Sequence, residues 1–223
     1  ERGGMDSFVP RRLVDVETQH IAELKRRALI ELREAPIEAT HDKNDFLLPT
    51  LSAAQQQVLD AIDRGHSSGK VALLHGVTGS GKTEIYIHLI ARTLAEGRDV
   101  LVLVPEIVIT SQLVERLERI FEGRTTTYHS RLTALRRGET FLRLATSAGG
   151  ELIVGVRSSI FLPHKNLGLI IVDEEHDSSY KQDSPAPRYN GRDTALMLSR
   201  IHGCDIILGS ATPSLEELYN CGC

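Results

Sequence analysis

The chain has 223 residues, of which 41% are hydrophobic and 25% are charged, and its formal net charge is -4. This length suffices for one sizeable α/β domain with a short appendage, and the charge excludes a protein that is basic over its whole surface, so any site for a polyanion must be local. The three cysteines, Cys204, Cys221 and Cys223, form no C-x-x-C pair, and their odd number argues against a disulfide framework.

No segment of the sequence is typical of membrane insertion or export. The longest apolar runs, such as residues 169–172, are strand-sized, whereas a membrane helix needs roughly 18 or more apolar residues. The opening residues 1–4 lack the apolar region of a secretory signal. Together with the cysteine pattern, these observations lead us to expect a cytoplasmic protein without a membrane partner.

Residues 1–46 are interpreted separately from the rest. Apolar Val16, Ile21, Leu24 and Ala28 recur at helical spacing, and the next five residues alternate as a strand does. A helix that ends in basic residues and leads into a strand is compatible with the tail of a winged-helix DNA module. A basic last turn is, however, also what the helix dipole favours. We expect a linker, with the winged-helix tail as the alternative.

Strands and helices alternate through residues 47–223. Ser52 is a predicted N-cap for the first helix, which carries Gln55. Strands are predicted over 71–75, 100–104, 125–128, 151–155, 168–173 and 205–209, and helices over 82–95, 110–121, 132–145, 191–202 and from 214 onward. This alternation predicts an α/β domain with a mostly parallel sheet that is covered by helices on both faces. Ligands of such sheets bind at the carboxyl edge of the strands.

A phosphate-binding loop is predicted between the first strand and the helix that follows it. The loop, here called the phosphate loop, fits G-x-x-x-x-G-K-[ST] and comprises Gly76, Val77, Thr78, Gly79, Ser80, Gly81, Lys82 and Thr83. Its glycines allow a tight turn whose backbone amides point inward, at the positive end of the helix dipole. Lys82 can reach the β and γ phosphates of a nucleotide, and the Thr83 hydroxyl can ligate Mg²⁺.

Carboxylates follow the predicted strand at 168–173. If this strand neighbours the strand before the phosphate loop, Asp173 reaches the same edge as Thr83 and can hold Mg²⁺. Glu174 then projects toward the γ phosphate and is the candidate general base for an attacking water. Alone, acids after a strand are more often a solvated helix start, so this interpretation depends on the phosphate loop.

Small hydroxyl residues, Ser210-Ala211-Thr212, end the predicted strand at 205–209. With the phosphate loop, the Asp-Glu-x-His run at 173–176 and Gln55, they resemble the first RecA-like lobe of superfamily-two helicases. Longer runs at 173–182 and 209–216 narrow the resemblance to the primosomal replication-restart helicases, over about residues 50–220. The implied fold is a RecA-like ATP-binding lobe.

The resemblance implies roles for individual residues and for the protein as a whole. Gln55 would read the adenine of ATP, and His176 would couple hydrolysis to DNA. The implied DNA-contacting or coupling residues are Pro105, Glu106, Thr110, Gly155, Arg157, Ser158, Tyr180, Lys181, Arg188, Tyr189, Arg192, Ser210 and Thr212. Aromatic rings mixed with cations suit single-stranded DNA. The implied activity is 3′-to-5′ unwinding of forked or single-stranded DNA at stalled forks, with ATP and Mg²⁺ as cofactors. Primosome proteins and single-stranded-DNA-binding protein are the implied partners.

The sequence departs from the family pattern in several places. Val156 stands where the family usually has Thr, and Asn190-Gly191 replaces the more usual His-Ala. The family's second lobe, its zinc-binding insertion and its N-terminal DNA-end-binding region have no counterpart in this sequence. Because that lobe supplies arginines to the γ phosphate, and losing such an arginine costs about 10³–10⁵ in turnover, we expect weak ATP hydrolysis from this chain alone.

Two other functions are considered. A nucleotide-gated binding switch would use the long loop at 175–190 to sense the γ phosphate without translocation along DNA. A small-molecule kinase is disfavoured by Gln55 and by the Ser-Ala-Thr segment. Hydrolysis measured with and without single-stranded DNA in the full-length protein, using Glu174→Gln, separates the three.

Overall fold

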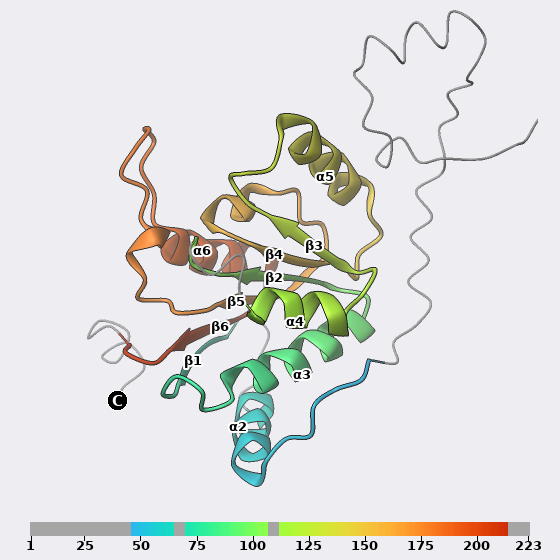
Figure 1. Ribbon diagram of the computed structural model, residues 1–223, viewed down its shortest axis with the longest axis vertical. Coiled ribbons are helices and arrows are strands. Elements are labelled where there is room, and N and C mark those ends of the chain that lie inside the picture. Colours follow the sequence, from blue (N-terminus) through green and yellow to red (C-terminus); the bar gives the residue numbers. More distant parts are fainter. Residues whose placement is uncertain (1–45, 65–69, 107–111, 214–223) are drawn as a thin grey trace, which may run out of the picture. The chain divides into compact units, whose positions relative to one another are not determined.

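The computed structural model describes residues 46–64, 70–106 and 112–213, which all lie in one compact unit that begins at Ala39. The expected helix near residue 20, the proposed linker at 1–46, Thr110 and the helix expected from residue 214 are outside these described residues or almost entirely so. The described part is an α/β domain built on one sheet (Figure 1).

Six parallel strands form the sheet in the order β1-β6-β5-β2-β4-β3. Their bounds are β1 Val71–His75, β2 Asp99–Leu103, β3 Thr125–Tyr128, β4 Leu152–Gly155, β5 Leu167–Val172 and β6 Asp205–Ser210. The helices are α2 Ala53–Arg64, α3 Lys82–Ala95, α4 Gln112–Ile120, α5 Ala134–Thr146 and α6 Gly191–His202, with short 3-10 helices η3 Arg157–Phe161 and η4 Ser178–Tyr180. The predicted fold class, a mostly parallel sheet within an α/β domain, is confirmed.

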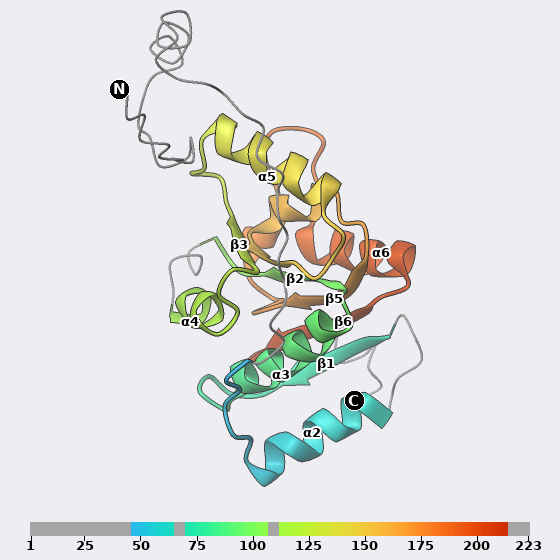
Figure 2. The ribbon, with the colours of Figure 1, turned by 90° about the vertical axis from the view of Figure 1, so that its right-hand side faces the viewer.

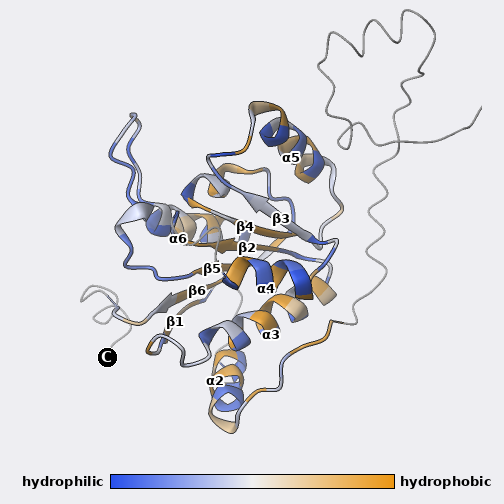
Figure 3. Ribbon diagram, viewed as in Figure 1, coloured by the Kyte–Doolittle hydropathy of each residue, from blue (hydrophilic) through white to orange (hydrophobic). Residues whose placement is uncertain are grey.

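Helices cover both faces of the sheet because the central strands are apolar on both sides. On one face, Val100 and Val102 of β2 pack with residues of α3 and α4; on the other, Leu101 and Leu103 pack with residues of α6 and η4. Successive side chains of a strand point to opposite faces, so a continuous apolar run buries both sides. The two views show α3 and α4 on one side of the sheet and α6 on the other (Figures 1 and 2), and the central strands as hydrophobic (Figure 3).

Local sequence sets the ends of helix α6. The Asn190 side chain accepts hydrogen bonds from the backbone amides of Arg192 and Asp193, as an N-cap does. At the other end Gly203 has a left-handed backbone with φ of 60°, which glycine adopts without steric cost. The departure from the family pattern at residues 190–191 thus places a capping residue at the start of this helix.

One conditional step of the sequence interpretation is wrong. The strand that leads to Asp173 does not neighbour the strand that leads to the phosphate loop, because β6 lies between β5 and β1. Since all three strands are parallel, their carboxyl ends still meet at one edge. The loops after β1, β5 and β6 therefore gather there, with the Ser-Ala-Thr segment in the middle.

Candidate active site at the carboxyl edge of the sheet

The phosphate loop has the backbone conformation that its glycines predict. Gly79 and Gly81 have φ of 80° and 89°, a region that other L residues adopt only under strain. The buried Lys82 turns back over the loop, and its Nζ donates a hydrogen bond of 2.7 Å to the carbonyl of Gly76. Residues 77–80 are exposed and Thr83 is half-buried at the start of α3. The loop thus surrounds a cation at the N-terminus of a helix, where anions bind.

The two carboxylates after β5 differ in their surroundings. Asp173 continues the sheet edge, since its backbone amide donates to the carbonyl of Leu103 at 2.9 Å. Burial raises the pKa of Asp173 above its usual range, against the opposing effects of a Tyr86 hydrogen bond and the Lys82 charge. Glu174 has a left-handed backbone with φ of 47°, and its Oε1 lies 3.8 Å from Nζ of Lys82. A strained non-glycine residue beside a charged loop is typical of a functional site.

His176 connects Glu174 to the Ser-Ala-Thr segment. Its Nδ1 lies 2.8 Å from Oγ of Ser210 and 3.8 Å from Oε2 of Glu174, and its Nε2 lies 3.2 Å from Oγ1 of Thr212. Ser210 is fully buried at the end of β6, whereas Thr212 is exposed. The structure therefore brings together Lys82, Glu174, His176 and the two hydroxyls.

Gln55 lies beside the phosphate loop and also caps its own helix. Its Oε1 accepts a hydrogen bond of 2.8 Å from the backbone amide of Ser52, and its own backbone amide donates to Oγ of Ser52 at 3.3 Å, which together form a reciprocal capping box. Its Nε2 donates to the carbonyl of Gly81 at 3.3 Å. These contacts fix the amide group next to the loop that would hold the phosphates.

Two tyrosines that contact Asp173 stand out in the structure. Tyr86, one turn after Lys82 on α3, donates its hydroxyl to Oδ1 of Asp173 at 3.0 Å. Tyr180 donates to the backbone carbonyls of Leu103 and Asp173, at 3.0 and 2.6 Å. Each side chain is 1% exposed, and burial raises the pKa of both hydroxyls well above the usual value. The helical spacing of Lys82 and Tyr86 is a signal from which sequence reasoning could have placed Tyr86 at the site.

The expectation that Tyr180 presents a stacking face to DNA is wrong for this structure. The ring belongs to the core on the α6 side of the sheet, and its hydroxyl joins the ends of β2 and β5. Arg192 also differs from the expectation: its side chain is 14% exposed, and its Nη1 lies 3.1 Å from Oε2 of the fully buried Glu175 carboxylate. A buried carboxylate needs such a partner. Both residues therefore have structural contacts that their predicted DNA role did not include.

Other predicted DNA residues gather around η4. Arg157 donates through Nη1 to the carbonyls of Ser179 and Lys181 at 2.6 and 3.2 Å. The amide of the exposed Glu106 donates to Oγ of Ser179 at 3.4 Å, and its carboxylate accepts a hydrogen bond of 2.8 Å from Ser130. Pro105 is buried, Ser158 is half-buried, and Gly155 ends β4. Glu106 follows β2 and Arg157 follows β4, and both contact Ser179 of η4.

The segment 181–190 projects beyond α6 (Figure 1). A bridge between Lys181 and Asn190 closes its base. Lys181 and Arg188 are exposed, and the half-buried Tyr189 meets the exposed ring of Phe161 edge to face, with ring centroids 5.0 Å apart. Of the two predicted aromatic contacts, Tyr189 is therefore the accessible one.

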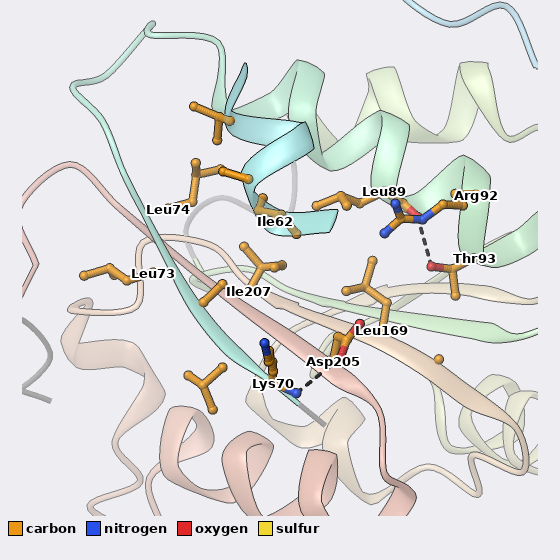
Figure 4. A pocket seen from close by; sticks show the side chains of 15 residues that line it. Ile62, Lys70, Leu73, Leu74, Leu89, Arg92, Thr93, Leu169, Asp205 and Ile207 are labelled. Atoms are coloured by element: carbon orange, nitrogen blue, oxygen red, sulfur yellow. Dashed lines mark hydrogen bonds between the residues drawn. The ribbon is translucent and has the colours of Figure 1, made fainter. Parts of the chain in front are cut away.

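A pocket lies at the opposite, amino edge of the strands (Figure 4). It has a volume of about 360 Å³ and is lined mostly by apolar side chains of α2, α3 and β1, including Ile62, Leu74 and Leu89. At its floor the amide of Lys70 donates to Oδ1 of Asp205 at 3.2 Å. It contains none of the predicted site residues.

Within residues 46–64, 70–106 and 112–213, no group of three or more His, Cys, Asp or Glu side chains is arranged to hold a metal ion. In the same part of the chain no helix has the length and hydrophobicity that crossing a membrane requires. The hydroxyl of Thr83 and the carboxylate of Asp173 are hard oxygen donors, which suits a magnesium ion that is otherwise held by phosphate and water.

The sequence and the fold match known helicases. The family model of the DEAD/DEAH box helicases matches residues 52–221. The replication restart protein PriA of Rickettsia felis is 44% identical over 193 residues, which are 86% of this chain and 29% of that protein. The PriA proteins of Helicobacter pylori strain 26695 and Bacillus subtilis are 48% and 44% identical over 79% and 74% of this chain, and 28% and 20% of their own lengths. The resemblance drawn from the motifs is confirmed.

A solved structure shares the fold. The helicase domain of Pyrococcus furiosus Hef superposes with a TM-score of 0.51 at 16% identity, over 76% of this chain and 35% of that one. At this identity the likeness supports the architecture alone. The chain spans less than a third of the length of the PriA relatives named above.

Proposed function

The chain belongs to the DEAD/DEAH box helicase family, and from that premise we propose that it is the ATP-binding lobe of a DNA helicase that restarts stalled replication forks. We infer the fork function from the PriA relatives, which are named replication restart proteins. The 3′-to-5′ polarity, the loading of a primosome and contact with single-stranded-DNA-binding protein belong to the same proposal.

One observation carries the proposal. The Glu174 carboxylate lies between Lys82 of the phosphate loop and His176, with 3.8 Å to a nitrogen of each. His176 in turn contacts both hydroxyls of the Ser-Ala-Thr segment. Glu174 can therefore respond when Lys82 binds the γ phosphate. Through His176, a change in the position of Glu174 can reach the Ser-Ala-Thr segment at the end of β6.

The chain's own residues divide the work of hydrolysis. The amides of the phosphate loop and the Lys82 ammonium bind the phosphates, and Lys82 exchanges its present contact with the Gly76 carbonyl for phosphate oxygens. Thr83 and Asp173 would hold Mg²⁺, which when bound neutralises charge on the β and γ phosphates. Glu174 accepts a proton from the attacking water, since a carboxylate is an effective base once held close to it.

Gln55 supplies the adenine contact in this proposal. A side-chain amide offers a donor and an acceptor that match the N6 and N7 edge of adenine. The amide is already held at the phosphate loop through the Gly81 carbonyl. Its Oε1 contact with the Ser52 amide must break or be shared when adenine binds.

DNA binding would use the accessible residues around η4. Exposed Lys181 and Arg188 attract the phosphate backbone, and the Tyr189 ring offers a stacking face. Because Arg157 and Glu106 both contact Ser179, DNA that binds at either strand end also acts on the turn that follows Asp173. This arrangement provides a route from DNA to the ATP site.

The test compares Glu174→Gln with Lys82→Ala in the full-length protein, where the second lobe can supply its arginines. Glu174→Gln should bind a fluorescent ATP analogue as tightly as wild type but lose hydrolysis of radiolabelled ATP, with and without single-stranded DNA. Lys82→Ala should lose binding. Glu96→Gln, at an exposed helix end far from the loop, is the matched control and should behave as wild type. A Glu174→Gln chain that hydrolyses ATP normally would contradict the proposal.

The second candidate function, a nucleotide-gated binding switch, gives a different result. The projecting segment 181–190 favours the switch, because η4 connects this segment to the site residues that follow β5. In a switch, nucleotide would change DNA affinity in wild type and in Glu174→Gln alike, and DNA would not stimulate hydrolysis. DNA-stimulated hydrolysis in wild type separates the motor from the switch.

A further inference from the structure

Tyr86 reaches Asp173 over the carboxyl end of strand β6. Helix α3, which carries Tyr86, packs on one face of the sheet against β2 and β5, and β6 is the neighbour of β5. The hydroxyl donates to Oδ1 of Asp173 at 3.0 Å, in a side chain that is 1% exposed. The contact therefore lies inside the protein, above Gly209 of β6.

Gly209 of β6 leaves the space that the Tyr86 hydroxyl occupies. A Cβ atom at residue 209 would lie 1.7 Å from the Tyr86 hydroxyl oxygen, 3.0 Å from Tyr86 Cζ and 3.4 Å from Oδ1 of Asp173. Gly209 is not among the glycines with positive φ, so the backbone conformation does not require glycine there. Glycine is needed at residue 209 because the Tyr86 hydroxyl occupies the space that a Cβ atom would fill.

The hydrogen bond fixes the direction of the Asp173 carboxylate. A buried tyrosine hydroxyl is costly unless it finds a partner, and the partner in this structure is the carboxylate proposed above to face Mg²⁺. Outer hydrogen bonds of this kind orient metal ligands, and their loss typically lowers metal affinity by roughly 10- to 100-fold.

We propose that Tyr86 is a positioning residue that aims the Asp173 carboxylate at the metal of a bound metal-nucleotide, through a window that Gly209 keeps open. The inference rests on the proposed function, because it takes Asp173 as the metal-facing group. It adds a residue outside the phosphate-loop motif to the site and gives a reason for glycine at residue 209. Tyr86 acts through Asp173 and touches neither nucleotide nor water.

The first experiment measures how Mg²⁺ changes nucleotide affinity. A fluorescent ATP analogue is titrated into the chain over a range of Mg²⁺ concentrations and in EDTA. Tyr86→Phe should raise the Mg²⁺ concentration needed for half-maximal tight binding by roughly 10- to 100-fold, while affinity in EDTA stays as in wild type. Thr93→Val, which removes a buried hydroxyl bonded to the Leu89 carbonyl on the same helix, is the matched control and should leave the Mg²⁺ dependence unchanged.

The second experiment tests the window without any nucleotide. Gly209→Ala should lower the urea midpoint of unfolding strongly in the wild-type background, because the new methyl overlaps the hydroxyl oxygen. In the Tyr86→Phe background the same substitution should lower it clearly less, because the overlapping atom is gone and the ring carbon is 3.0 Å away. Equal effects in both backgrounds would overturn the window.

The outcomes separate this inference from the proposed function. If wild type binds the analogue in a Mg²⁺-dependent way and Tyr86→Phe keeps that dependence, the positioning role is wrong and the helicase proposal stands. If wild type shows no Mg²⁺-dependent binding, both are wrong. A fall in stability of Tyr86→Phe with unchanged Mg²⁺ dependence would identify a purely structural hydrogen bond and would also overturn the role.

Discussion

Removing the hydroxyl of Tyr180 tests whether this residue supports the site from inside the protein or contacts DNA from its surface. In Tyr180→Phe the ring remains and only the donor to the carbonyls of Leu103 and Asp173 is lost. The Leu103 carbonyl keeps the Asp173 amide as a donor, so the main loss falls on the Asp173 carbonyl. A buried acceptor left without its donor costs about 1–3 kcal/mol.

This loss of unfolding free energy corresponds to a decrease in the melting temperature Tm. For a domain of this size, each kcal/mol shifts Tm by about 2–4 °C, so Tyr180→Phe should lower Tm by about 2–12 °C. Thermal unfolding followed by circular dichroism measures the shift, and urea unfolding should show a lower midpoint with an unchanged slope. Tyr128→Phe is the matched control, because the Tyr128 hydroxyl has no recorded hydrogen bond within the described part of the chain.

A surface role for Tyr180 gives the opposite result. A ring that stacks on bases would keep its face in the phenylalanine variant and lose no internal hydrogen bond. Equal Tm values for Tyr180→Phe, Tyr128→Phe and wild type would therefore refute the buried role and restore the stacking interpretation.

Two further predictions concern packing and pH. Gly138→Ala should raise unfolding stability by about 0.5–1 kcal/mol, because it replaces a glycine within helix α5 and its Cβ meets nothing within 4 Å. Gly155→Ala should instead lower stability by about 1–3 kcal/mol, since its Cβ would lie 2.7 Å from the Tyr128 carbonyl oxygen; urea midpoints measure both, and a stable Gly155→Ala would contradict the close approach. Burial lowers the pKa of His164, against a hydrogen bond from its ring to the Ser159 carbonyl and the charge of Asp99. The unfolded chain therefore takes up a proton that the folded chain does not, so stability should fall as pH drops below the usual histidine pKa of about 6.5. The urea midpoint of His164→Gln should fall less than that of wild type between pH 7 and 5.5. If the two midpoints fall equally over this pH range, the buried neutral ring is refuted.

The sequence by itself determined the phosphate loop and the fold class. Residues 76–83 are contiguous, and their conformation depends on local properties: glycines that permit positive φ, and a strand and a helix on either side. The alternation of apolar strands with helical segments likewise predicts a parallel sheet with both faces covered, because an apolar run such as residues 169–172 can be buried only from both sides. These features depend on short-range order and on hydrophobic patterning.

Only the tertiary structure decided which distant groups meet. The position of β6 between β1 and β5 places Ser210 and Gly209 inside the site and lets Tyr86 reach Asp173. The burial of Tyr180 depends on how η4 folds back over β2 and β5, and the sequence alone made a surface aromatic in a polar loop equally reasonable. Arg192 finds Glu175, 17 residues away, for the same reason. Strand order and loop return are set by the packing of the whole domain, so side-chain surroundings at the site follow from long-range contacts that no local pattern encodes.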